Sequence, residues 1–448
     1  MRVALTIDGL APGGEGVGEA GGRAVFVPFA APGDRVEVEL EPGEGPGRAA
    51  LLRVVEAGPA RRDPPCPHFG PVADGPERGC GGCEWLHVEY RAQLSAKERG
   101  LVERLRRLGR VEPGSYRLLP AVPSPRPLRY RSRARLHLDR RLGRLVFFRR
   151  RSHDPVPVRT CHLLEPGLEA LREAAGPALL AAGLEPRAVA LEWSEREARG
   201  SAALHLPALT PAARERAGRL LSALPGLKGL VLLAEGSPPA LAGEPVLLHD
   251  RVPGDPASGA QRSRPDVFAQ ANRGANALLV RAALDLLRPD GEEALELFCG
   301  AGNFTGPLAR RARAVAAAEA QGPALELARR DLEGAPVRFF AGEALGLARA
   351  LARERGPGAP RFGVALLDPP RDGAKGIGPA LRELGVPRAV YVSCDPATLA
   401  RDLRGCAEAG YRVAAVQAVD MFPQTHHVEA VALVVAGGGA GGVPERDW

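Results

Sequence analysis

The sequence predicts an α/β protein with three parts: a small N-terminal β-barrel, a central α+β domain, and a C-terminal domain built on a doubly wound parallel sheet. The 448 residues exceed what one hydrophobic core usually organises, which favours several domains. Short strands with glycine-rich breaks fill the first 58 residues, whereas strands alternate with helical segments from about residue 263. We therefore expect domains at residues 1–58, 59–262 and 263–448.

The N-terminal segment alternates apolar and polar residues with the period of β-strands. Glycines at the breaks favour tight turns and a strongly curved small barrel, similar to an oligonucleotide-binding (OB) barrel. Barrels of this kind often bind oligonucleotides, although a purely structural β-module fits the pattern equally well. The apolar positions that define the strands are Val3, Leu5, Ile7, Val25, Phe26, Val27, Val36, Val38, Leu40, Leu51 and Val54.

The central segment begins with the proline-rich linker 59–67 and continues into an amphipathic helix at 89–108. This helix is a candidate for packing on the C-terminal domain. Residues 165–250 combine helix and strand signals and contain no group of residues that we could assign to chemistry.

Arginine is concentrated in residues 126–151, a segment that contains eleven arginines. Basic residues alternate there with apolar or small ones, so strands with a hairpin near Gly143 would carry a row of arginines on one face. With a net charge of +7, this segment indicates a polyanionic partner such as nucleic acid, the alternative being ordinary solvated surface.

Several classes of protein are disfavoured by the composition. No apolar run approaches the roughly 20 residues of a membrane-spanning helix, and the first residues do not resemble a secretion signal. We therefore expect a cytoplasmic protein without a membrane association, and nothing in the sequence implies a protein partner.

The C-terminal domain is predicted from one helix at 276–287 and strands at 294–298, 314–318, 364–367 and 389–393. Gly300 and Gly302 follow the first strand in a turn where the backbone could approach a bound nucleotide. Glu319 ends the second strand, where it could accept hydrogen bonds from a ribose. The third glycine, Gly306, lies one residue beyond its position in the GxGxxG motif of dinucleotide dehydrogenases, which counts against that class of enzyme.

Two further residues are candidates for covalent and acid–base chemistry. Cys394 ends a strand and Asp395 begins a helix, so we expect helix-terminal N–H groups to favour a nucleophilic thiolate. Glu429 lies where a proline-containing loop enters a strand and is the candidate general base, with His426 and His427 as alternatives. The remaining thiols of this domain, Cys299 and Cys406, are expected to be core residues.

Four other cysteines, Cys66, Cys80, Cys83 and Cys161, have the pattern of a metal site, because a CxxC pair is joined by two further thiols. Four thiolates suit structural zinc and an iron–sulfur cluster equally well on ligand count.

Together these residues resemble the RNA uracil-5-methyltransferase family, in its branch with a TRAM domain and an iron–sulfur cluster. The resemblance covers nearly the whole chain except the middle of the central domain. It implies a TRAM barrel at 1–58, a Rossmann-like methyltransferase domain, and S-adenosylmethionine as methyl donor to C5 of a uridine in RNA. It also implies a structural [4Fe-4S] cluster on Cys66, Cys80, Cys83 and Cys161.

By the same resemblance, Cys394 is the nucleophile that adds to uracil C6, and Glu429 removes the C5 proton. The cofactor contacts fall on Gln270, Phe298, Asn303, Glu319 and Asp368. The family favours 23S rRNA as substrate over tRNA, because the bacterial tRNA enzymes generally lack the TRAM domain and the cluster. A non-catalytic RNA-binding factor on the same scaffold is the alternative from another class.

The chain departs from the family pattern in two places. Thirteen residues separate Cys66 from Cys80, about twice the usual number. Glu343 stands where the family often contacts the adenine with a short polar side chain.

Overall fold

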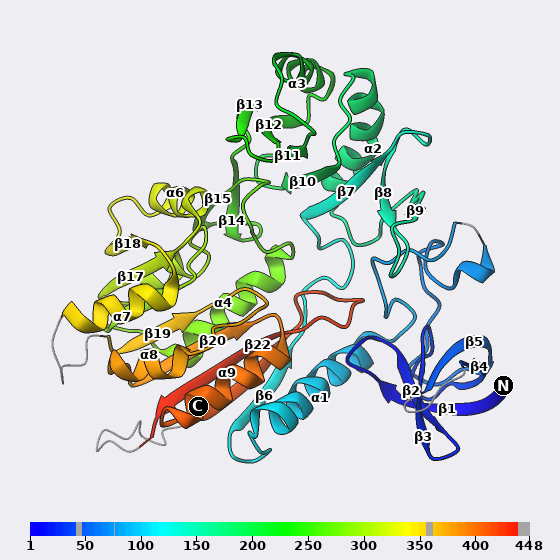
Figure 1. Cartoon of the computed structure of the whole chain (residues 1–448), viewed down its shortest axis with the longest axis horizontal. Coiled ribbons are helices and arrows are strands. Elements are labelled where there is room, and N and C mark those ends of the chain that lie inside the picture. Colours follow the sequence, from blue (N-terminus) through cyan, green and yellow to red (C-terminus); the bar gives the residue numbers. More distant parts are fainter. Residues whose placement is uncertain (42–46, 76, 355–361, 438–448) are drawn as a thin grey trace. The chain divides into compact units, whose positions relative to one another are not determined.

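The computed structural model describes residues 1–41, 47–75, 77–354 and 362–437 (Figure 1). They divide into two compact units, each assembled from separate stretches of chain. Unit 1 contains residues 1–100, 124–274 and 422–427, and unit 2 contains 101–123, 275–421 and the chain from 428 onward. The predicted boundaries near 58 and 262 stay a prediction, and residues 438–448 of the third predicted domain lie outside the described residues.

Unit 1 begins with a closed five-stranded barrel of order β1-β2-β3-β5-β4. Leu5, Ile7, Val25, Val36 and Val38 fill its interior, as the alternating pattern predicts. The predicted small barrel is therefore confirmed. Its strands are β1 (Arg2–Leu10), β2 (Gly16–Ala20), β3 (Arg23–Val27), β4 (Arg35–Leu40) and β5 (Gly47–Glu56).

A seven-stranded sheet of order β13-β12-β11-β10-β7-β8-β9 forms the central part of unit 1. Strands β7 (Arg133–Asp139) and β8 (Arg144–Phe148) are an antiparallel pair around Gly143, which confirms the predicted hairpin. The other strands are β9 (Pro155–Val156), β10 (Ala188–Ser194), β11 (Arg199–His205), β12 (Leu227–Leu233) and β13 (Ala240–Gly243).

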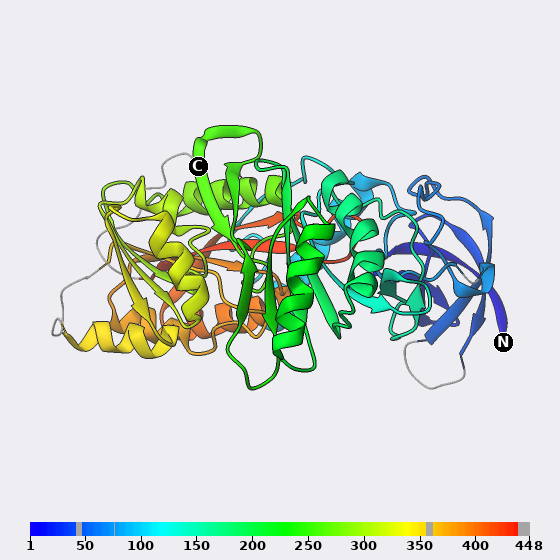
Figure 2. The same ribbon diagram turned by 90° about the horizontal axis from the view of Figure 1, so that it is seen from above.

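Two helices cover the apolar side of this sheet and share its core with Leu136, Leu191 and Leu230. Figure 2 shows these helices, α2 (Pro166–Ala181) and α3 (Pro211–Ala223), side by side in green. The hairpin of β14 (Leu247–Val252) and β15 (Asp255–Ser263) completes the strands of unit 1.

The predicted amphipathic helix is present as α1 (Tyr90–Gly109). Leu101 and Leu105 on its second half are fully buried in the core of unit 2. After α1 the chain forms β6 (Arg117–Val122), which pairs in parallel with β21 (Tyr411–Val419) of the same unit.

Unit 2 is built on an eight-stranded sheet of order β18-β17-β16-β19-β20-β22-β21-β6. The strands from β18 to β20 are parallel and include all four strands expected from the sequence. Their bounds are β16 (Glu293–Leu297), β17 (Ala314–Glu319), β18 (Val337–Ala341), β19 (Val364–Leu367) and β20 (Arg388–Ser393). The sheet continues through β22 (Glu429–Ala436), which is antiparallel to both β20 and β21.

Helices α4 (Arg273–Leu287), α5 (Thr305–Ala309), α6 (Gly322–Asp331), α7 (Ala344–Glu354), α8 (Ile377–Glu383) and α9 (Pro396–Glu408) alternate with these strands. Helices α8 and α9 lie side by side (Figure 1) because Gly378 lets the backbones approach. A Cβ at Gly378 would lie 2.6 Å from the Gly405 carbonyl oxygen and 2.7 Å from the Cys406 Cα. Among the described helices, none has both the length and the apolar character needed to cross a bilayer.

Candidate active site

The candidate site residues of unit 2 lie at one edge of its sheet, where the parallel strands end. Phe298 follows β16, Glu319 ends β17, Asp368 follows β19 and Cys394 follows β20. Carboxyl ends of parallel strands are where open α/β sheets bind their ligands. The exposed Glu343 follows β18 at the same edge.

The glycine-rich turn after β16 has the backbone freedom that a nucleotide site requires. Gly300 and Gly302 have φ values of 55° and 83°, and a Cβ at Gly300 would meet no atom within 4 Å. Phe298 also has a positive φ, 65°, a conformation that is uncommon for a bulky residue and concentrates at functional sites. The Gly300 N–H donates to Glu319 Oε2 at 2.9 Å, which fixes the carboxylate against the turn.

Asn303 is held by a second side chain that the sequence analysis did not identify. Its amide exchanges two hydrogen bonds with Asn276 of α4, at 2.8 and 2.9 Å. Asn276 lies in the predicted helix, but no sequence signal distinguished it from a core polar residue.

The pairing of β20 with β22 brings the candidate nucleophile and base together. Ser393 is paired with Ala430, so the same register one residue further sets Cys394 opposite Glu429. Directly opposed residues of antiparallel strands project from the same face with their Cβ atoms about 5 Å apart. Glu429 is buried and Cys394 is partly exposed.

Burial raises the pKa values of all three acidic groups at this site. Burial raises the pKa of Asp368 to about 7. Burial, with the neighbouring Asp368, raises the pKa of Glu429 well above its usual range, while Arg371 opposes the shift. Burial raises the pKa of the Cys394 thiol to about 11, and Glu429 adds to the rise while Arg371 lowers it.

The expectation that helix α9 would favour a Cys394 thiolate is therefore wrong. Asp395 caps the helix with its own side chain, which accepts hydrogen bonds from the N–H groups of Ala397 at 2.8 Å and Thr398 at 3.0 Å. These helix-terminal N–H groups therefore donate to the Asp395 carboxylate. The pKa of the Cys394 thiol is set mainly by burial, with a further rise from Glu429.

Arg371 is the cation of the site, and the sequence analysis had not assigned it a role. The loop that carries it is anchored from α9: the buried Asp402 carboxylate accepts from the Ala374 N–H and the Tyr391 hydroxyl, both at 2.7 Å. Arg401 donates to the Asp372 carbonyl oxygen at 2.6 Å. No spacing in the sequence linked these residues, because they meet only across the folded strands.

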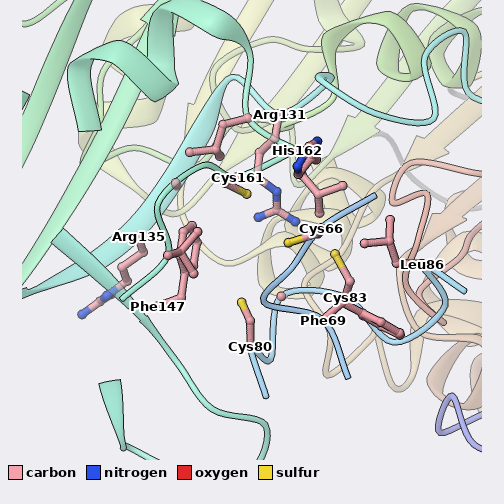
Figure 3. Close-up of a pocket in the computed structure, with 15 residues that line it drawn as sticks. Cys66, Phe69, Cys80, Cys83, Leu86, Arg131, Arg135, Phe147, Cys161 and His162 are labelled. Carbon is pink, nitrogen blue, oxygen red and sulfur yellow. The ribbon is translucent and has the colours of Figure 1, made fainter. Parts of the chain in front are cut away.

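The four predicted metal ligands of unit 1 line a single cavity. Cys66, Cys80, Cys83 and Cys161 surround a space of about 180 Å³ whose other walls include Phe69, Leu86 and Phe147. Figure 3 shows the four sulfur atoms turned toward this space.

The thiols influence one another. Burial, and then the neighbouring thiols Cys161 and Cys66, raise the pKa of Cys80 to about 12. Burial raises the pKa values of Cys66, Cys83 and Cys161 as well. Within the described chain, no three His, Cys, Asp or Glu side chains converge tightly enough to hold a metal ion.

Comparisons with known proteins identify the family. The family model for tRNA (uracil-5-)-methyltransferase matches residues 258–436, and the TRAM domain model matches residues 2–43. A 23S rRNA (uracil(1939)-C(5))-methyltransferase of Pseudomonas entomophila is 36% identical over 97% of this chain and 93% of its own length. The enzyme of the same name from Acidithiobacillus ferrooxidans is also 36% identical, over 95% of this chain and 96% of its own.

The chain belongs to the RNA uracil-C5-methyltransferase family. The fold agrees with that of a solved structure, the Pyrococcus abyssi tRNA (uracil-54, C5)-methyltransferase in complex with S-adenosyl-L-homocysteine. The TM-score is 0.70 at 23% identity, covering 97% of this chain and all of the other.

Three other predicted site residues of this methyltransferase lie in unit 1. Gln270 is buried on the segment that precedes α4, where the Ser132 N–H donates to the adjacent Ala271 carbonyl oxygen at 2.8 Å. His426 lies 3.5 Å from Glu84, Nδ1 to Oε2, and its ring is tilted against that of His427.

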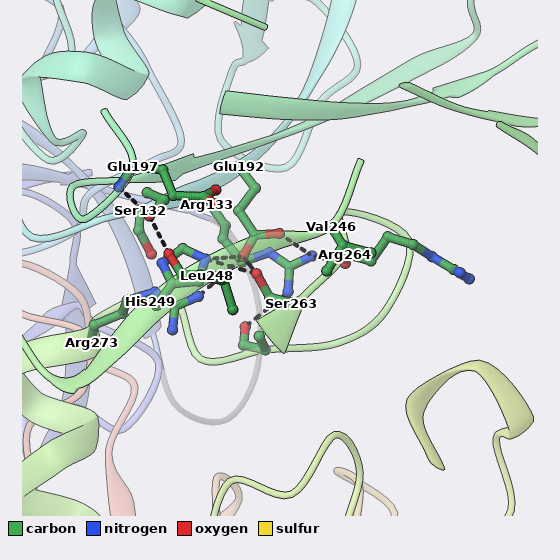
Figure 4. Close-up of polar contacts among 12 residues, drawn as sticks. Ser132, Arg133, Glu192, Glu197, Val246, Leu248, His249, Ser263, Arg264 and Arg273 are labelled. Atoms are coloured by element: carbon green, nitrogen blue, oxygen red, sulfur yellow. Dashed lines mark hydrogen bonds and ion pairs between the residues drawn. The ribbon is translucent and has the colours of Figure 1, made fainter. Parts of the chain in front are cut away.

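The predicted row of arginines proves to be mixed in its contacts. Arg135 is exposed, but Arg133 on the same face of β7 turns inward and donates to the Arg264 carbonyl oxygen at 3.2 Å. Figure 4 shows Arg133 and Arg273 around the buried Glu192, with Arg273 Nη2 3.1 Å from Glu192 Oε1. Arg133 therefore stabilises unit 1 internally.

Proposed function

We propose that this protein transfers a methyl group from S-adenosylmethionine to C5 of a uridine in 23S rRNA, through a covalent bond between Cys394 and uracil C6. The observation that carries the proposal is the group formed by Cys394, Glu429, Asp368 and Arg371 at one edge of the sheet, beside the glycine-rich turn.

The chemistry needs a nucleophile and a base at separate positions. Uracil C5 is a weak nucleophile, so the Cys394 sulfur adds to C6 and the electron pair of the C5–C6 bond moves toward the O4 carbonyl. C5 then takes the methyl group. Glu429 removes the C5 proton, the double bond re-forms, and the bond from Sγ to C6 breaks.

The protonation of the site defines what activation requires. Because burial raises the pKa values of Cys394 and Glu429, the thiolate and the carboxylate that these two steps need form less readily here than they would in water. Arg371 lowers both pKa values. S-adenosylmethionine supplies the methyl group and a positive charge at sulfur, and a cation favours the deprotonated forms in the same direction as Arg371.

The residues around the glycine-rich turn fit this methyl donor. Gly300 leaves open space, Glu319 presents a fixed carboxylate for ribose hydroxyls, and Asp368 lies at the end of the neighbouring strand. We assign cofactor contact to Phe298, Asn303, Glu319 and Asp368 of unit 2, and on the family resemblance alone to Gln270.

For the substrate we favour rRNA over tRNA because the relatives at 36% identity carry 23S rRNA in their names. The test is methyl transfer from labelled cofactor to 23S rRNA and to tRNA from a strain that lacks the gene. We expect 5-methyluridine in 23S rRNA; label only in tRNA would contradict the choice of substrate, and label in neither would favour a non-catalytic RNA-binding factor.

The covalent mechanism is tested by blocking its two steps separately. Cys394→Ala removes the group that activates C5, so neither methyl transfer nor an adduct is expected. Glu429→Gln keeps the size of the side chain but loses the base, so methylation proceeds while elimination stalls. The Glu429→Gln enzyme should migrate on a denaturing gel as a protein–RNA adduct that carries the labelled methyl group.

Two results would contradict this mechanism: methyl transfer by Cys394→Ala, or an adduct on a residue other than Cys394. Cys406→Ala is the matched control, because Cys406 is a buried core thiol of α9. We expect it to retain methyl transfer.

We also assign a [4Fe-4S] cluster to Cys66, Cys80, Cys83 and Cys161. The cavity of about 180 Å³ is far larger than the roughly 10–15 Å³ that a single water needs, so it suits a multi-atom group better than one zinc ion. Backbone N–H groups of His68, Phe69 and Gly82 point at the sulfurs of Cys66 and Cys80, as is common around iron–sulfur ligands. The cluster would cross-link the 66–83 loop to the segment of Cys161.

Protein purified without oxygen should be brown and should contain iron and sulfide in equal amounts, about four of each per chain. Exposure to air should bleach it. One zinc per chain without iron would contradict the assignment.

A further inference from the structure

A second pocket lies beside the four-cysteine cavity in unit 1. It has a volume of about 560 Å³, within the range of roughly 300–1,000 Å³ that is usual for small-ligand sites. Gly82 and Phe147 line both spaces. Its remaining lining residues are Gly13, Gly81, Glu84, Phe148, Arg149, Arg150, Arg151 and His426.

The wall of this pocket is built from backbone that the cysteine loop holds in place. Cys80 forms an antiparallel bridge with Arg149, and the Gly81 N–H donates to the Phe148 carbonyl oxygen at 3.0 Å. The Arg150 N–H donates to the Gly79 carbonyl oxygen at 3.1 Å. The turn that carries the three arginines is therefore fixed to the 66–83 loop, which carries three of the four cysteines.

One end of the pocket has an incompletely satisfied positive charge. Arg150 and Arg151 share a single carboxylate, Glu15, at 3.3 and 2.7 Å. Arg150 Nη2 also donates to the Gly13 carbonyl oxygen at 3.2 Å, but its buried Nη1 makes no hydrogen bond to any residue that the structure describes. Since a buried guanidinium N–H without an acceptor is unfavourable, this end is suited to bind an anion.

The other end has a different chemistry. Glu84 presents a carboxylate that accepts hydrogen bonds and repels phosphate, and His426 lies against it. Phe148 supplies an apolar wall, with its ring stacked on His137 at 4.3 Å between centroids. A ligand that fills the pocket must therefore join an anionic group to a flat ring with N–H donors.

We propose that this pocket binds one unstacked nucleotide of the single-stranded RNA substrate. The phosphate lies at Arg150 and Arg151, and the base lies along Phe148 with its N–H groups toward Glu84. This recognition follows the common pattern for single-stranded RNA, in which a basic surface holds the backbone while aromatic and polar groups hold a splayed base. The inference rests on the proposed function only in taking RNA as the substrate.

The first test compares two arginines of the β7–β9 region. Arg150→Met removes the proposed phosphate contact, and Arg140→Met removes the same charge from an exposed arginine that pairs with Glu185. RNA affinity is measured over a range of salt concentrations with a 23S rRNA fragment that the wild-type protein binds. We expect Arg150→Met to weaken binding about tenfold and to reduce the salt slope by about one, and Arg140→Met to leave both nearly unchanged.

The second test asks whether a base enters the pocket. Abasic nucleotides are placed one at a time along the same RNA. Removing the base at one position of the RNA should weaken binding to the wild-type protein roughly tenfold. The same abasic RNA should bind the Phe148→Leu variant about as well as the intact RNA does, because that variant has already lost the stacking contact. If every abasic effect adds to that of Phe148→Leu, or if Arg150→Met matches Arg140→Met, the proposal is wrong.

The controls separate this inference from the proposed function. Circular dichroism checks that each variant folds, and Arg151→Met, which removes the other arginine at the proposed phosphate position, replaces Arg150→Met if the latter does not fold. Binding that responds as expected in an enzyme that methylates no uridine would contradict only the proposed function. Normal methylation without these binding effects would contradict only the nucleotide pocket.

Discussion

Arg371 offers a direct test of the electrostatics at the candidate active site. It is the cation that lowers the pKa of Cys394, against burial and Glu429, and the balance leaves the pKa near 11 in place of 9.0. At pH 8 a difference of two pKa units reduces the thiolate from about 10% to about 0.1% of the protein. An opposite charge at close range typically changes a pKa by 1–3 units, so for the exposed Arg371 we take about one.

Arg371→Met should therefore move the pH midpoint of Cys394 alkylation upward by about one unit and slow the reaction about tenfold at pH 8. The assay is the rate of iodoacetamide labelling in short pulses between pH 7 and about 13, measured on the Cys394 peptide by mass spectrometry. Arg371→Lys should restore most of the rate. Arg404→Met, on the exposed side of α9, is the matched control and should have no effect.

A midpoint that stays the same or falls in Arg371→Met would refute this account of the site. So would a wild-type midpoint below 9, because Cys394 would then be an activated thiol despite its burial. Glu429→Gln should move the midpoint in the opposite direction to Arg371→Met, which distinguishes electrostatics from a change in access to the sulfur.

Three further predictions concern stability. Burial lowers the pKa of His249 to about 4, so below pH 6.5 the unfolded chain binds more protons than the folded protein. The free energy of unfolding should therefore fall by up to roughly 3 kcal/mol between pH 6.5 and pH 4. Urea unfolding across that range should show a smaller fall for His249→Gln. Gly378→Ala should lower the free energy of unfolding by roughly 1–3 kcal/mol because its Cβ meets the backbone of α9, whereas Gly405→Ala, with open space around it, should raise that free energy by up to about 1 kcal/mol; the melting temperatures of the two variants should move in opposite directions. Asp402→Asn should cost about 1–3 kcal/mol and Tyr391→Phe less, since the first disturbs four hydrogen bonds to a buried carboxylate and the second removes the two of one hydroxyl; equal losses in thermal unfolding would contradict the anchoring role of Asp402.

Features encoded by local sequence patterns could be predicted. The barrel strands alternate, the four predicted strands of unit 2 are short apolar runs between helices, and α1 has a clear amphipathic spacing. The grouping of Asp368 with Cys394 also followed, because both end neighbouring parallel strands.

Features that depend on distant pairing could not be predicted. β6 joins β21 across nearly 300 residues, and no local signal marks Arg117–Val122 as an edge strand of that sheet. The raised pKa of Cys394 depends on Glu429, which reaches it only through the register of β22. Likewise, Arg133 belongs to the alternating basic pattern, but its inward contacts are made by segments more than a hundred residues later.

The early position of β6 and the second half of α1 affects how the chain is completed during synthesis. Leu101, Leu105, Val111 and Tyr116 leave the ribosome long before the strands they pack against, and β21 is made only after residue 410. These apolar side chains must therefore stay without their final partners while some 290 residues are added. A gene fragment that begins at residue 258, where the family match begins, would encode the eight-stranded sheet without its edge strand and leave β21 open to pairing with other chains.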